Sequence, residues 1–146
     1  WKVVTDQVMG GQSQAEMHYA DNAVQFTGQV SLANNGGFIQ IQWPLKKELN
    51  IATYTGLYVE WRASKETPID WVLKTSQLWL PWQSYRHKTQ ASTTWQTLYI
   101  PFDAFSPYRT TTQLNLKKLT KFSLLAGGQA MQVDLAIKEM GLYLDE

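Results

Sequence analysis

The apolar residues of this chain recur at every second position over most of its length. In VQFTGQVSL, residues 24–32, apolar residues and Gly28 occupy the even positions, and glutamine, threonine and serine occupy the odd ones. Side chains of a β-strand point alternately to opposite faces, so this period predicts strands with one buried face. The same alternation marks Phe38–Trp43, Gly56–Ala63, Ile69–Thr75, Trp82–Thr89, Trp95–Ile100, Phe122–Ala126 and Met131–Leu144. We therefore predict an all-β fold: a jelly-roll β-sandwich of two antiparallel sheets in one domain, residues 1–146.

Local signals refine this prediction. Asp21 and Asn22 favour a turn that pairs Ser13–Tyr19 with the strand from Val24 as a hairpin. In the last segment the apolar residues change parity at Lys138–Glu139, which predicts a β-bulge. We expect one short helical turn over Lys46–Ile51 and a loop over Asp103–Leu119. The in-phase aromatic residues are expected to build the core; they include Phe26, Trp43 and Trp61.

Composition limits the chemistry of the chain. There is no cysteine, which excludes disulfides, thiolate metal sites and a cysteine nucleophile. Lys and Arg number 13 against 12 Asp and Glu, so the basic excess of a nucleic-acid binder is missing and we expect no such partner. No apolar run approaches the ~20 residues of a membrane span. The N-terminus does not determine the compartment, which stays unknown; the sequence shows no Arg-rich amphipathic targeting segment and favours a soluble protein of the bacterial cytoplasm or periplasm over the mitochondrion.

Two glycine-rich stretches lie near the start of the chain, at residues 9–13 and 34–38. Neither contains the lysine of a phosphate-binding loop or leads into a helix, so both are predicted to be tight turns. Asp6 and Ser13 are expected to hydrogen-bond to the backbone of neighbouring turns. The residues predicted to shape this end of the molecule are Asp6, Gly10, Gly11, Ser13, Asn35, Gly36 and Gly37.

The titratable residues form no recognisable catalytic or metal-binding pattern. His18 and His87 are too far apart in sequence for a metal motif, and Glu16, Glu60 and Glu139 do not group on one strand. We predict no catalytic residue, no metal and no cofactor, and therefore not an enzyme. Two carboxylates roughly 5–10 Å apart in a cleft would restore a hydrolase as an alternative. A calcium site of oxygen ligands also stays open.

A cluster of aromatic residues in the middle of the chain does not follow the alternation. The segment QLWLPWQSYRHK has apolar residues at both parities around Pro81, so they do not all face one core. Exposed aromatic side chains beside polar groups stack on sugars or anchor protein partners. The alternative is that these residues cover the core beneath the 103–119 loop. The predicted ligand or partner surface consists of Trp79, Trp82, Tyr85, Arg86 and Arg109.

Several motifs resemble those of the complex I intermediate-associated protein (thirty-kilodalton) family. The first, Asp-x-Val-Met-Gly-Gly-x-Ser, is met at residues 6–13, and the second spans 26–38 with Phe26, Gly28, Val30 and the paired glycines. Trp95 with Ile100-Pro101-Phe102, Phe105-x-Pro107 and the closing VDLAIKEMGLYL are also similar. One departure is Thr110 after Arg109, where the family tends to have glycine.

The resemblance implies a galactose-binding-domain-like jelly roll, and in mitochondria a chaperone-like role in assembling respiratory complex I. Our first hypothesis is therefore a non-catalytic domain that binds a protein partner, as an assembly factor for a respiratory membrane complex. The alternative is a carbohydrate-binding module of the same fold. The third hypothesis is an enzyme, either a glycosidase or a reductase-like accessory.

Overall fold

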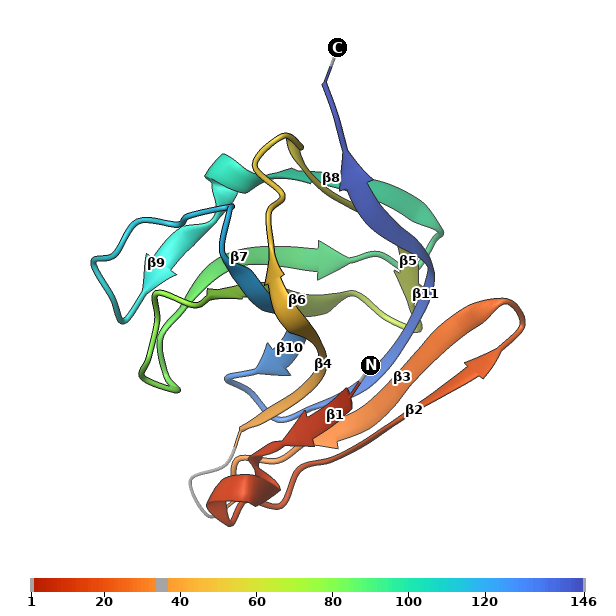
Figure 1. Cartoon of the computed structure of the whole chain (residues 1–146). Helices are drawn as coiled ribbons and strands as arrows, with labels where there is room; N and C mark the ends of the chain where they lie inside the picture. The colour runs from red at the N-terminus through yellow and green to blue at the C-terminus, as the bar shows by residue number, and fades with distance from the viewer. Residues whose placement is uncertain (1, 34–36, 146) are drawn as a thin grey trace.

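The computed structural model describes residues 2–33 and 37–145, which form two antiparallel β-sheets packed face to face (Figure 1). Sheet A has six strands in the order β1 (Lys2–Thr5), β4 (Phe38–Leu49), β10 (Leu119–Gly127), β6 (Thr67–Thr75), β7 (Ser84–Ala91) and β9 (Ser106–Tyr108). Sheet B has five strands in the order β2 (Gln14–Ala20), β3 (Ala23–Val30), β11 (Met131–Tyr143), β5 (Gly56–Ala63) and β8 (Gln96–Pro101). Short 3-10 turns, η1 (Asp6–Met9) and η3 (Phe102–Ala104), follow β1 and β8. Over the described residues, no helix has the length and apolarity needed to cross a bilayer.

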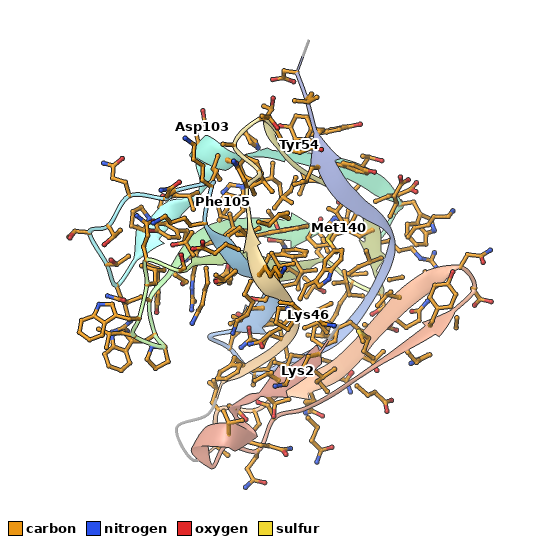
Figure 2. All side chains as sticks on the ribbon, in the orientation of Figure 1. Lys2, Lys46, Tyr54, Asp103, Phe105 and Met140 are labelled. Carbon is orange, nitrogen blue, oxygen red and sulfur yellow. The ribbon has the colours of Figure 1, made fainter. Side chains whose placement is uncertain are left out.

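The core lies between the two sheets and is rich in aromatic side chains. Trp61 of sheet B meets Trp71 of sheet A with ring centroids 5.6 Å apart, and Trp71 also stacks on Phe122 at 6.0 Å. In Figure 2 side chains from both sheets fill the space between them. Just after β8, Asp103 is exposed while Phe105 is buried beneath it. The burial of alternate residues on both sheets confirms the two-sheet sandwich predicted from the period of two.

Three local predictions are confirmed. β2 and β3 pair as a hairpin that forms one edge of sheet B (Figure 1), and its turn residues Asp21 and Asn22 have φ of 56° and 60°. These positive angles match the two-residue turn whose twist suits antiparallel strands. The register of β11 against β5 shifts between Ile137 and Glu139, where the bulge was expected. Phe26 and Trp61 are fully buried.

Three other expectations are wrong in detail. Lys46–Ile51 does not form a helical turn, because β4 continues to Leu49. Its register against β10 is irregular, since Lys121 pairs with Pro44 but Leu119 pairs with Leu49, and proline has no N–H to donate. Trp43 is 41% exposed rather than a core residue, although its ring contacts Phe122. The segment 103–119 is not all loop, because it contains β9.

Candidate functional site

The motif around Asp6 builds a hydrogen-bonded cluster where the two sheets meet. Asp6 lies in η1 and is completely buried. Its Oδ1 accepts the N–H of Ser13 at 2.9 Å, and its Oδ2 accepts the N–H groups of Gly37 and Phe38 at 2.5 and 3.2 Å. Asp6 and Phe38 belong to the β1 and β4 side of the molecule, and Ser13 leads into β2. One carboxylate therefore ties the start of sheet A to the start of sheet B.

Ser13 extends this cluster to the end of β3. Its hydroxyl donates to Asp6 Oδ2 at 2.5 Å and accepts the N–H of Ser31 at 2.8 Å. The side-chain amide of Gln7 donates to the Ser13 carbonyl at 2.8 Å. Burial by itself would raise the pKa of Asp6, but the hydrogen bonds from Ser13, Gly37 and Phe38 favour the charged form, and the pKa is lowered. The hydrogen bonding expected of Asp6 and Ser13 is thus present.

The paired glycines of the motif serve this same cluster. Gly10 ends η1 with φ of 86°, in the left-handed region that favours glycine. A Cβ on Gly11 would overlap the carboxyl group of Asp6, so only glycine fits there without movement. The predicted turn residues Asn35 and Gly36 lie outside the described residues. We call Asp6, Gly10, Gly11, Ser13 and Gly37 the Asp6 cluster.

The outer face of sheet A carries two adjoining hollows, which we call the sheet A groove. The smaller hollow has a volume of about 240 Å³, and its polar lining includes Gln40, Gln42, Lys74, Arg86 and Lys121. The larger one, about 640 Å³, is lined by residues that include Asp70, Arg86, Lys88, Gln90 and Tyr108. Arg86 and Leu125 line both, so the two hollows adjoin on the face formed by β4, β10, β6, β7 and β9.

Trp82 forms part of the wall of the smaller hollow and is 56% exposed. It lies in the loop between β6 and β7, residues 76–83, which hydrogen bonds hold in place. The Lys74 ammonium donates to the Pro81 carbonyl at 2.6 Å, and the Leu80 N–H donates to the Gln83 side chain at 3.3 Å. Trp79, in the same loop, is 85% exposed and does not line the groove. Two of the aromatic residues predicted to be at the surface are therefore exposed.

Tyr85 does not belong to the surface, so this part of the predicted contact surface is wrong. Its side chain is 0% exposed and points into the core from β7, opposite Leu73 of β6. Its hydroxyl donates to the Thr112 carbonyl at 2.9 Å, in the segment that follows β9. Burial raises the pKa of this phenol. Tyr85 thus takes the alternative role considered for the aromatic cluster, since it packs beneath the 103–119 segment.

Arg86 and Arg109 both lie close to the ring of Tyr108. The guanidinium of Arg86 lies 3.8 Å from the centroid of the Tyr108 ring, and that of Arg109 lies 5.3 Å from it. Arg86 Nε also donates to Ser84 Oγ at 3.1 Å. A hydrogen bond with Arg109 lowers the pKa of Tyr108. Arg86 faces the groove, whereas Arg109 is exposed just beyond β9 with φ of 57°.

Most of the residues that line the groove are not among those predicted from the sequence. Gln40, Gln42, Lys74, Lys121 and Tyr108 were not selected, although the first two alternate with buried Ile39 and Ile41. The signal was present in each strand as an outward-facing polar position. Which outward positions lie side by side depends on the strand order, and that order brings residues 40, 74 and 121 together.

Two carboxylates, Asp21 and Asp134, line one hollow of about 420 Å³ over the strands of sheet B, whereas the sheet A groove holds no carboxylate pair among its described residues. Asp70 is the one carboxylate among the residues that line the described groove. Glu139 accepts a hydrogen bond from the Tyr58 hydroxyl at 2.8 Å on the opposite sheet. No group of three or more His, Asp or Glu side chains suited to a metal ion occurs within residues 2–33 and 37–145.

Comparison with solved structures places the fold among carbohydrate-binding modules. The family 11 module from Clostridium thermocellum, in complex with a β-1,3-1,4-mixed-linked tetrasaccharide, is 9% identical with a TM-score of 0.72; the match covers 91% of this chain and 83% of that one. A family 30 carbohydrate-binding module is 11% identical with a TM-score of 0.61, covering 94% of this chain and 77% of that one. The agarase AgWH50C is 11% identical with a TM-score of 0.70, covering 90% of this chain but only 22% of the agarase.

At these identities the likeness concerns the fold alone, a galactose-binding-like jelly roll. No curated protein sequence matches the chain. The family model for Complex I intermediate-associated protein 30 (CIA30) matches residues 1–137, which is most of the chain and includes the motifs described above except the second half of the closing one. The chain therefore belongs to the complex I intermediate-associated protein 30 family.

Proposed function

We propose that this domain is a non-catalytic binding module that holds a glycan chain in the sheet A groove. One observation carries the proposal: an exposed indole, Trp82, forms a wall of a hollow whose floor is lined with side-chain amides and cations. A glycan needs this combination, because sugar rings have apolar faces that pack on aromatic rings and hydroxyl groups that require hydrogen-bond partners.

The neighbouring side chains suit this role. Gln40 and Gln42 project from β4 into the hollow, and each amide both donates and accepts hydrogen bonds. Ser84 and Ser123 lie beneath these side chains and are almost completely buried, so the amides and cations are the polar groups that face a ligand. The two hollows adjoin at Arg86, an arrangement that suits a ligand of several consecutive sugar units rather than one. The fold likeness to modules that bind glycans supports the proposal, although fold alone does not determine function.

Substitution of the two loop tryptophans tests the proposal. On a panel of neutral and acidic oligosaccharides, we expect saturable binding that Trp82→Ala weakens about tenfold or more, as for an aromatic anchor residue. Trp79→Ala is the matched control, because Trp79 lies in the same loop but outside the groove lining. Calorimetric titration measures both. If no oligosaccharide binds saturably, the proposal fails.

A second candidate function follows from the family and from Trp79. The family name links its members to intermediates of complex I, and a tryptophan that is 85% exposed is an unusual surface residue in a monomer. In this reading the domain binds a protein partner as an assembly factor for a respiratory membrane complex, with Trp79, Trp82, Arg86 and Arg109 as the contact surface. Affinity capture from solubilised membranes tests it. A respiratory-complex subunit should be captured by the wild type and lost with Trp79→Ala, which the glycan proposal does not require.

A further inference from the structure

The smaller hollow of the sheet A groove is lined by three cations and by no described carboxylate. Lys74 projects from β6, Arg86 from β7 and Lys121 from β10, on neighbouring strands of one sheet face. The chain as a whole is nearly neutral, with a formal charge of +1. The positive charge in this hollow is therefore a local arrangement and not a consequence of composition.

The surroundings of these cations do not neutralise them. Burial lowers the pKa of Lys74, and the nearby charges of Lys121 and Arg86 lower it further. Burial also lowers the pKa of Lys121, with a contribution from Lys2. Like charges thus face one another in a half-buried site, an arrangement that an anion placed among them would relieve.

Each cation has donors left for a ligand. The Lys121 ammonium makes no hydrogen bond or ion pair with any described residue. Lys74 donates one hydrogen bond, to the Pro81 carbonyl, and an ammonium has three N–H groups. Arg86 uses Nε on Ser84, so its two terminal nitrogens are not engaged by that bond. The same Arg86 packs over the Tyr108 ring, which restricts the movement of its guanidinium group.

We propose that the glycan bound in this groove is anionic: it carries carboxylate or sulfate groups that Lys74, Arg86 and Lys121 bind while a sugar ring packs on Trp82. This inference rests on the proposed glycan-binding function and adds the chemical class of the ligand. The larger hollow differs, because Asp70 lies opposite Lys88 across β6 and β7 and offsets its charge. The anionic group is therefore recognised in the smaller hollow, and the chain continues past Arg86 into a more neutral one.

Matched pairs of oligosaccharides test the proposal. The first pair is an oligogalacturonate and its carboxyl-reduced form, and the second is a carrageenan oligosaccharide and its desulfated form. We expect the charged member of at least one pair to bind. Its neutral counterpart should bind at least about tenfold more weakly, and added salt should lower the affinity for the charged ligand only. The pair that shows the difference identifies the group as a carboxylate or a sulfate ester.

Two lysine variants separate local recognition from general charge. Lys121→Gln should weaken binding of the charged ligand roughly tenfold, as expected for a charged hydrogen bond. Lys47→Gln removes the same charge from an exposed position on β4 outside the groove lining and should leave binding unchanged. Equal losses in the two variants would overturn the proposal, because the effect would then come from net charge.

The remaining outcomes distinguish this inference from the function on which it rests. If charged and neutral members of both pairs bind equally well, the anionic inference fails and the glycan-binding function stands. If no oligosaccharide binds, both fail. If a polyglutamate peptide binds with loss in Lys121→Gln while no glycan binds, the cations recognise acidic protein segments, and the glycan assignment is overturned.

Discussion

The Asp6 cluster and the sheet A groove differ in how their charged side chains are surrounded: the carboxylate of the cluster has hydrogen-bond donors around it, whereas the cations of the groove have other cations. In the cluster, one carboxylate accepts hydrogen bonds from Ser13, Gly37 and Phe38, and its pKa is lowered. In the groove, Lys74 and Lys121 face other cations, and their pKa values are lowered by burial and repulsion, which disfavour the charged form. The arrangement in the cluster stabilises the folded state. The arrangement in the groove destabilises it through repulsion between cations, and a bound anion would remove that repulsion. A motif that is easy to recognise in sequence need not mark the proposed binding site.

The largest expected effect is the loss of the Asp6 carboxylate. Asp6→Ala leaves the buried N–H group of Ser13 and the partly buried N–H groups of Gly37 and Phe38 without their acceptor. We expect the free energy of unfolding to fall by about 3–5 kcal/mol, because each unsatisfied buried donor costs about 1–3 kcal/mol. Urea denaturation measures this loss. A decrease comparable to that of an ordinary surface substitution would show that the cluster does not hold the sheets together.

The pH dependence shows whether the charge of Asp6 is responsible. Its pKa in the folded protein is lowered below the ordinary 3.8, so its contribution to stability is fully present above that value. The contribution is lost as the pH falls through 3.8 toward the folded-state pKa. Asp6→Asn should therefore lack this part of the acid-induced loss of stability. If its unfolding free energy followed that of the wild type in parallel down to low pH, the charge would not be the cause.

A smaller effect is expected where backbone and carboxylate approach each other. Gly11→Ala places a methyl group against the Asp6 carboxyl, and such overpacking typically costs about 1–3 kcal/mol. Gly10→Ala is the control next to it, since its Cβ meets nothing within 4 Å and only the left-handed backbone, with φ of 86°, is strained. That strain costs about 1 kcal/mol. In thermal unfolding, Gly11→Ala should have a lower melting temperature than Gly10→Ala. The reverse order would mean that the Asp6 side chain moves easily to make room for the added methyl group.

The sequence predicts the strands and turns better than it predicts the sheet A groove, because the two depend on interactions over different distances along the chain. The strands, the β2–β3 hairpin and the bulge near Glu139 follow from alternation and turn chemistry, which act over a few residues. Tyr85 was misplaced because Pro81 and the loop after β6 interrupt the alternation, and the phase of β7 is set by its pairing with β6.

The groove depends on relations that are distant in sequence. Gln40, Lys74 and Lys121 come together only because β4, β10 and β6 are neighbours in sheet A. The partners of Asp6 are also remote, since Gly37 and Phe38 lie 31 and 32 residues away. The residues of the Asp6 cluster could nonetheless be predicted from the sequence, because they belong to recognisable family motifs. The residues on the floor of the groove belong to no such motif.

The smallest expected effect on stability is at Lys121. If the groove cations serve binding rather than folding, removing one of them should hardly change the free energy of unfolding. Lys121→Gln removes one of the like charges that face Lys74, and the Lys121 ammonium makes no hydrogen bond to a described residue. We therefore expect the unfolding free energy to stay within about 0.5 kcal/mol of the wild type, or to rise slightly. Urea denaturation at low salt measures it, with Lys47→Gln as the charge-matched control. A large loss of stability would mean that Lys121 supports the fold as Asp6 does, and the contrast between a structural cluster and a groove prepared for an anion would no longer hold.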